Sequence, residues 1–574
     1  MIMSTMKNYI SAVFLLIGTT LFGQDVILQG QTRREIEKAS RIASHPVIDD
    51  TIVQQKVTEY PLLAVQHNTS TQVDSIEPAA IKIKEQLDQL YTTYIKLGIG
   101  TELMPLGEVY FNNTRSRKYI YGANVKHLSS WGNLPNYERS TFDRTSVGAY
   151  GGINEKRYQL LGNINYRNQG LHYYAIEAPL DSLGKDRTRQ RYEDVGFNVM
   201  YKNQAKIDTF GINYQLGLTY NHFNTMKPKI DSLKDWRSRE NFFAFNGLGE
   251  YRLKENIYTV GLDIMHNKYR YGNEGDSLSP IDTARVRPNT IVSLKPSFKT
   301  YLWNDKFKAT VGIDLTVNAD NGKTKVHIYP VAEVKYSLFN DIFIPYIGVK
   351  GGMKQQSLKS LTLENEFLRP NVEMKNQNTA IEVYGGFKGT LSKNISFNVG
   401  GGYALVQNLA MFVNDTLFSP RNRFDVIFDT AKIFTLTGSI SYQMLEKLKV
   451  DVIANYRSYE MKNNAYAWNK PDFELITRVH YNLFEKFYLN FDFKLETGRK
   501  ALTYEDGEGI SQKDLQYYKK LGAIYDFNLG LEYRYTRRLS VFVQLNNIAA
   551  QRYQRWYNAP VHSFQVLGGL TFRL

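Results

Sequence analysis

The sequence "FQVLGGLTFRL", residues 564–574, ends the chain on a pattern typical of a β-strand. Strict alternation of this kind indicates a strand with one apolar face and one polar face. A strand at the very end of a chain needs partners on both edges, and a closed barrel supplies them because its last strand pairs with its first. The apolar residues that form this predicted closing-strand assembly signal are Phe564, Val566, Leu570, Phe572 and Leu574.

The same alternation recurs upstream, in "IFTLTGSISYQM" (433–444), "LNFDFKL" (489–495) and "FNLGLEYRY" (527–535). Runs of about ten to sixteen residues are longer than the strands of soluble sandwiches and long enough to cross a bilayer at a tilt. Very short turns alternate with long polar loops, as in outer-membrane barrels. The predicted long loops are 172–189, 223–237, 272–288, 354–378, 409–432, 460–472, 498–521 and 548–562.

These patterns predict an all-β fold, a transmembrane antiparallel up-and-down β-barrel of about 22 strands. The first strand is expected near Tyr94, in "YIKLGIGTE", and the barrel over residues 93–574. An even number of strands places both ends of the barrel on the periplasmic side. The predicted location is therefore the outer membrane.

The N-terminal region is expected to direct export. Residues 1–23 combine Lys7, an apolar run over 10–17 and a small-residue exit, so they are predicted to be a signal peptide. Residues 24–92 are predicted to form a short periplasmic or lumenal segment. This segment is expected either to thread the lumen or dock a periplasmic partner, or to act as a disordered tether.

Composition excludes several classes of site. The chain has no cysteine, which rules out disulfides, thiolate metal sites and a cysteine nucleophile. The nine histidines are scattered, and no nucleophile elbow or phosphate loop occurs, so neither an enzyme nor a cofactor is predicted. Glu505, Asp506 and Glu508 offer a calcium loop, but a solvated acidic loop is the favoured interpretation. No nucleic-acid partner is expected for an integral outer-membrane protein.

Charge leaves two interpretations open. The net charge is +15 and the chain holds 41 tyrosines, which suit membrane interfaces. The surplus indicates either attraction to anionic lipid headgroups or cargo, or dispersed loop charge. Charged residues on the polar strand faces either select permeating anions or neutralise one another across neighbouring strands. These candidate lumen charges are Lys449, Asp451, Arg457, Glu474, Arg478, Asp492, Lys494, Glu532 and Arg534.

The last thirty or so residues resemble the closing hairpin of TonB-dependent receptors. The similarity lies in an Asn-Asn before the loop, Tyr553, Trp556 and Pro560 within it, and the final strand. The N-terminal sequence is similar to receptor-like barrel proteins of Bacteroidota. The resemblance implies a 22-stranded barrel, but residues 24–91 are too few for the folded plug of such receptors, so a plug-less barrel is expected.

Two functions follow from this resemblance and its departures. The first is transport of solute across the outer membrane, in company with a surface lipoprotein that presents cargo. The second is a non-transporting structural or assembly subunit that anchors a multi-protein complex. In either case the expected partners include outer-membrane lipid with lipopolysaccharide and the barrel-assembly machinery. The lumen is expected to be filled by the loops 354–378, 409–432 and 498–521 or by the N-terminal segment.

Overall fold

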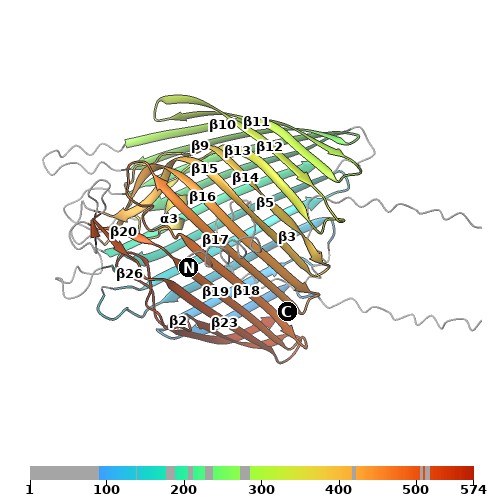
Figure 1. Ribbon diagram of the computed structural model, residues 1–574. Coiled ribbons are helices and arrows are strands. Elements are labelled where there is room, and N and C mark those ends of the chain that lie inside the picture. The colour runs from blue at the N-terminus through green and yellow to red at the C-terminus, as the bar shows by residue number, and fades with distance from the viewer. Residues whose placement is uncertain are drawn as a thin grey trace, which may run out of the picture.

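Twenty-two antiparallel strands form one closed sheet in the computed structural model of the protein (Figure 1). The structure describes residues 90–114, 116–137, 139–175, 188–203, 211–225, 237–271, 285–415, 422–503, 509–510 and 517–574. The barrel strands are β1 (Thr93–Gly100), β2 (Met104–Asn112), β3 (Tyr119–Ser130), β4 (Phe142–Asn154), β5 (Tyr158–His172), β6 (Arg189–Asn203), β7 (Ile212–Thr225), β8 (Arg239–Leu253), β9 (Asn256–Tyr271), β10 (Arg285–Leu302), β11 (Phe307–Asp320), β12 (Lys323–Tyr336), β13 (Ile344–Lys354), β14 (Gln377–Ser392), β15 (Ile395–Asn414), β16 (Phe424–Met444), β17 (Leu448–Met461), β18 (Phe473–Leu483), β19 (Phe487–Thr497), β23 (Ile524–Arg534), β24 (Leu539–Asn546) and β27 (Gln565–Arg573).

Small elements lie in the connections between these strands. A helix, α3 (Leu358–Glu364), lies between β13 and β14. A three-stranded sheet of β20 (Lys500–Thr503), β21 (Gly509–Ile510) and β22 (Tyr517–Lys520) follows β19. A two-stranded hairpin, β25 (Gln554–Trp556) and β26 (Ala559–Pro560), precedes β27. No helix among the described residues is long and apolar enough to cross a membrane.

The barrel closes where β27 pairs with β1. Leu97 faces Leu570 and Gly98 faces Gly569 across this seam, and the backbone N–H of Thr92 donates to the carbonyl of Leu574 at 2.8 Å. The fold and the strand number predicted from the alternating pattern are therefore confirmed.

The two ends of the barrel differ in their connections. Most connections at one end are short, such as 254–255, 393–394, 445–447 and 484–486, and both barrel termini lie at this end. The other end carries the long loops, although β11 and β12 are joined there by the two-residue turn Asn321-Gly322. Both turn residues have positive φ, as the Asn-Gly sequence of a tight hairpin requires.

One predicted loop is wrong. Residues 409–432 were expected to form a long loop, but β15 runs on to Asn414, β16 begins at Phe424, and only 415–423 connect them. Paired residues past the usual span of a membrane strand are buried here: Phe412 and Phe424 are almost fully inaccessible to solvent. The strand continues because an apolar core at the barrel mouth covers it.

Alternating side chains give the wall two faces. Apolar residues such as Leu97, Ile440 and Leu570 are more than half exposed on the outer face. Aromatic rings cluster on that face near the short-turn end, where Trp303 packs on Phe307 with ring centroids 5.1 Å apart. An outward apolar band bordered by aromatic rings is the surface expected of a barrel that spans a bilayer.

Candidate functional site at the closed mouth of the barrel

Residues 355–376, which we call the inner segment, connect β13 to β14. The segment folds locally because Ser357 and Ser360 form a reciprocal capping box at the start of α3, each side chain accepting from the other's backbone N–H at 3.0 Å. Leu358 and Leu361 are buried on one side of this short helix. Figure 1 places α3 toward the end of the barrel where β20 and β26 lie.

Charged side chains join the inner segment to the wall formed by β4, β5 and β6. The Glu366 carboxylate accepts from the Arg144 guanidinium at 2.8 Å and from the Gln169 amide at 2.5 Å. The Lys359 ammonium lies 2.8 Å from an Asp194 carboxylate oxygen. These partners come from three neighbouring strands, so the segment follows the inner surface of the wall.

Backbone groups of the inner segment are satisfied by buried side chains from β8, β9 and the residue before β8. The Glu240 carboxylate on β8 accepts from the Leu358 N–H. The Pro370 carbonyl accepts from the Tyr269 hydroxyl at 2.9 Å and from the Ser238 hydroxyl at 2.6 Å. A segment without regular structure can be buried only where such partners replace water.

The opposite wall is contacted by the same segment. The Arg369 N–H donates to the Phe424 carbonyl at 2.8 Å, and the Phe424 N–H donates to the Phe367 carbonyl at 3.0 Å. The Arg369 guanidinium also binds the Asp425 carboxylate at 2.9 Å. Strands β5 and β16 lie 11 strands apart in a ring of 22, yet Asn422 beside β16 donates to the Tyr173 carbonyl beside β5 at 2.6 Å. The two walls therefore meet over the mouth, and the segment crosses from one to the other there.

An apolar cluster fills the space around this crossing. Trp556 of β25 lies at its edge, with its ring 5.1 Å from that of Phe412 and 5.9 Å from that of Phe424. The cluster draws side chains from both walls, the inner segment and the last hairpin. Its buried members are Leu171, Tyr173, Ala175, Tyr192, Phe223, Tyr269, Leu358, Leu361, Phe367, Leu368, Val372, Met374, Ala410, Phe412, Phe424, Val426, Trp556 and Ala559.

The three residues of the family-like last loop lie beside this cluster. Pro560 accepts a 2.7 Å hydrogen bond at its carbonyl from the Tyr174 hydroxyl of the β5–β6 connection. Burial, together with the Asp526 carboxylate, raises the pKa of the Tyr553 hydroxyl. Trp556 contributes packing, as described above. The closing hairpin is therefore also part of the mouth.

Arg499 joins two further loops over the mouth. Its buried guanidinium donates to the carbonyls of Gln554 at 2.9 Å, Arg555 at 2.7 Å and Gly522 at 3.1 Å. The loop after β19 is thereby fixed to the loop before β27. Sequence reasoning missed this residue because its partners are backbone carbonyls, which leave no mark in the sequence.

The predicted lumen charges lie on the face opposite the apolar band, and several approach one another. The ladder places Arg478 between Asp451 and Asp492, and the Arg534 guanidinium lies over the Tyr488 ring, 4.6 Å from its centroid. Their ion pairs include Lys449–Asp451 at 3.6 Å, Arg457–Glu474 at 3.9 Å, Lys494–Glu474 at 3.7 Å, Lys494–Glu496 at 2.5 Å and Arg573–Glu532 at 3.3 Å.

The remaining predicted residues divide into two groups. Phe564, Leu570, Phe572 and Leu574 are exposed on the outer face, and Val566 is half-buried on the same strand face. The predicted signal peptide, most of the predicted segment 24–92, and the acidic residues Glu505, Asp506 and Glu508 lie outside the described residues. Among the described residues no group of three or more His, Asp or Glu side chains is placed to hold a metal ion.

The inner segment was predicted as a loop able to fill the lumen, but its binding residues were not identified. A signal was present in the sequence, because Leu358 and Leu361 have helical spacing and "FL" at 367–368 is apolar within an otherwise polar connection. Its partners Arg144, Asp194 and Glu240 are distant in sequence, and only the register of the closed barrel brings them to one place.

The fold is shared with solved outer-membrane receptors and transporters. The ferripyoverdine receptor of Pseudomonas aeruginosa aligns with a TM-score of 0.61 and 10% identity over 85% of this chain and 72% of its own. The FrpB iron transporter of Neisseria meningitidis aligns with a TM-score of 0.63 and 11% identity over 85% of this chain and 82% of its own. The copper transporter OprC aligns with a TM-score of 0.58 and 11% identity over 84% of this chain and 80% of its own. No model of a known protein family and no curated protein sequence matches the chain.

Proposed function

We propose that this protein is an outer-membrane barrel that takes part in the transport of solute, with a mouth closed at rest by the inner segment. The observation that carries the proposal is that residues 355–376 bind opposite walls of the barrel at the end that bears the long loops. Closure by a few ion pairs and hydrogen bonds, such as Arg144–Glu366 and Arg369–Asp425, is reversible in principle.

Two further observations support transport. Proteins that share the fold are described as iron and copper transporters and as a siderophore-complex receptor. The inner face of the wall is polar and carries ion-paired charges, as a solute pathway requires. The same proposal includes four expectations from the sequence. They are export by the signal peptide 1–23, a short segment 24–92 without a plug, kinship with Bacteroidota barrels, and a surface lipoprotein as partner.

A second function, the structural or assembly anchor, is favoured by the packing of the mouth. Leu358, Leu361, Leu368 and Val372 of the inner segment are at most 1% exposed, which is the burial of a stable core rather than of a loose gate. Exposing four such side chains would cost roughly 6 to 12 kcal/mol, given about 1.5 to 3 kcal/mol for each. An anchor protein has no need to open the mouth.

Planar-bilayer conductance of the purified protein separates these functions. The test variant is Glu366→Ala with Arg369→Ala, which removes the bonds of Glu366 to Arg144 and Gln169 and the bond of Arg369 to Asp425. The control is Lys432→Ala, which breaks an ion pair with Glu460 on the outer face. Transport predicts a closed wild type and control, and a variant with frequent large openings. An anchor predicts that all three stay closed, and a steadily open wild type would refute closure itself.

A further inference from the structure

Three basic side chains stand together on the outer wall of the barrel, with no carboxylate partner among the described residues. They are Arg239 on β8 and Lys268 and Arg270 on β9, which we call the cationic patch. Their direction is fixed by their neighbours: Glu240 and Tyr269 bind the inner segment inside the barrel, so the residues on either side of them point outward. All three patch residues are exposed.

The register places like charges opposite each other. Arg239 is the direct ladder partner of Arg270, and Lys268 pairs with Asn241 one outward position nearer the membrane band. Like charges directly opposite on neighbouring strands destabilise a sheet. Within the part of the chain that the structure describes, no Asp or Glu oxygen lies within 4.0 Å of these three cations. The arrangement is favourable once an anion is shared between the cations.

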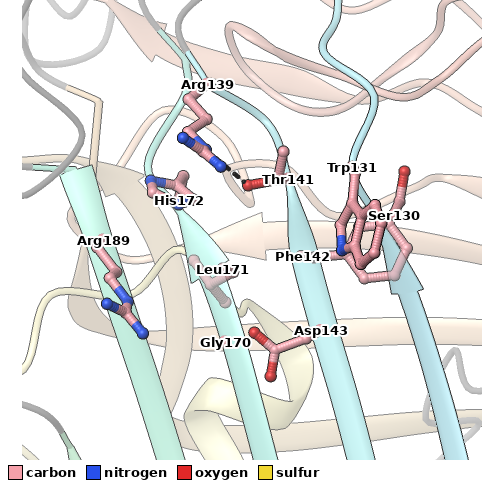
Figure 2. A pocket seen from close by; sticks show the side chains of 10 residues that line it. All are labelled: Ser130, Trp131, Arg139, Thr141, Phe142, Asp143, Gly170, Leu171, His172 and Arg189. Carbon is pink, nitrogen blue, oxygen red and sulfur yellow. Dashed lines mark hydrogen bonds between the residues drawn. The ribbon is translucent and has the colours of Figure 1, made fainter. Parts of the chain in front are cut away.

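Two other outward cations near the long-loop end are paired with carboxylates. Arg191 binds Asp143 at 2.7 Å beside a cavity of about 480 Å³ at the ends of β3 to β6, and Figure 2 shows Asp143 in its lining. Lys432 binds Glu460 at 2.8 Å on the far side of the barrel. The nearest outward carboxylate to the patch along the ladder is Glu193, which is separated from Arg239 by Asn224 on β7.

The height of the patch on the wall identifies the anion. Phe243 on β8 and Val260 on β9 are exposed members of the apolar band, and Asn241 and His266 begin the polar zone above it. The three cations lie one or two outward-facing positions beyond Asn241 and His266, toward the long-loop end. This corresponds to about 7 to 13 Å along a strand. In a bilayer this is the depth of the headgroup phosphates.

We propose that the cationic patch binds the phosphate groups of a lipopolysaccharide-type glycolipid in the outer leaflet. The inference rests on the outer-membrane location in the proposed function, but not on transport. Arg239 and Arg270 hold one phosphate between them by charge-assisted hydrogen bonds, and Lys268 adds a point charge toward the membrane. The bound lipid thereby removes the repulsion between the two strands.

Binding of diphosphorylated lipid A to protein refolded in detergent tests the site. The variant Arg239→Gln with Lys268→Gln and Arg270→Gln is compared with Lys432→Gln. We expect the triple variant to bind lipid A roughly 100-fold more weakly, because each lost cation weakens binding by about tenfold or less. Binding by the control variant is expected to be unchanged. Equal binding by the triple variant and wild type would overturn the proposal. So would full displacement of lipid A by millimolar inorganic phosphate, since the site would then serve the free ion.

Thermal unfolding with and without lipid A supplies a second readout. In lipid-free detergent, Arg270→Gln relieves the like-charge pair and is expected to raise the unfolding temperature. With lipid A present, the wild type is expected to gain more than the variant. This single substitution also serves if the triple variant fails to fold. A lower unfolding temperature for Arg270→Gln in both conditions would contradict the site, while conductance would continue to report on transport separately.

Discussion

At the scale of single residues, closure of the mouth depends on polar groups that replace water around an irregular buried segment. Ser238 is fully buried, and its hydroxyl contacts both the Pro370 carbonyl and the Asn371 side-chain oxygen. One buried hydrogen bond of this kind contributes about 0.5 to 1.5 kcal/mol to stability. Such residues carry no motif, which is why sequence reasoning did not find them.

Ser238→Ala is therefore expected to destabilise the mouth by about 0.5 to 1.5 kcal/mol, because the Pro370 carbonyl loses one of its two donors and keeps the Tyr269 hydroxyl. The measurement is resistance of the inner segment to protease in detergent, with the whole barrel followed by its heat-modifiable migration on a gel. Ser458→Ala, an exposed serine on β17, is the matched control and is expected to behave as wild type. Equal resistance in Ser238→Ala and wild type would show that this contact does not hold the segment.

At the scale of elements, α3 shows how a seven-residue helix persists in a loop. Isolated helices of this length are unstable in water, so the capping box and the burial of Leu358 and Leu361 must stabilise it. The sequence pattern predicted the strands well because period-two alternation is a local property. It predicted the mouth poorly because strands β15 and β16 extend past the membrane only where other loops cover them.

Ser357→Ala is expected to loosen α3 by about 1 kcal/mol through loss of the N-cap. Hydrogen exchange of the amides of 358–364 should accelerate by roughly fivefold, since 1.4 kcal/mol corresponds to a tenfold change. Ser357→Asn, which retains a good N-cap, should restore the protection. If neither variant changes the exchange, tertiary burial alone holds the helix.

At the scale of the whole molecule, the barrel is completed by a seam that the terminal alternation predicted. What the alternation could not show is how closely the two strands approach. A Cβ atom on Gly569 would clash with the Leu97 carbonyl oxygen, whereas one on Gly568 would meet nothing nearer than 3.7 Å. The backbone therefore leaves room for a side chain at position 568 but not at position 569.

Gly569→Ala is expected to impair closure of β27 on β1 and to reduce folded barrel in the outer membrane severalfold, with unfolded chain accumulating. Gly568→Ala is the matched control, with the same change in strand propensity and no clash, and should assemble as wild type. The measurement is the folded fraction by heat-modifiable migration. Equal assembly of the two variants would mean that the seam shifts readily and that its register is not fixed at this glycine.

A disulfide tests most directly whether the inner segment is held against the end of β16, where the two walls meet over the mouth. The chain has no cysteine, so Leu368→Cys with Phe424→Cys introduces a single pair at positions joined by a β-bridge. We expect nearly complete cross-linking in intact outer membranes, a closed barrel while oxidised, and no cross-link in either single variant. Free thiols that remain open to alkylation in the double variant would contradict it.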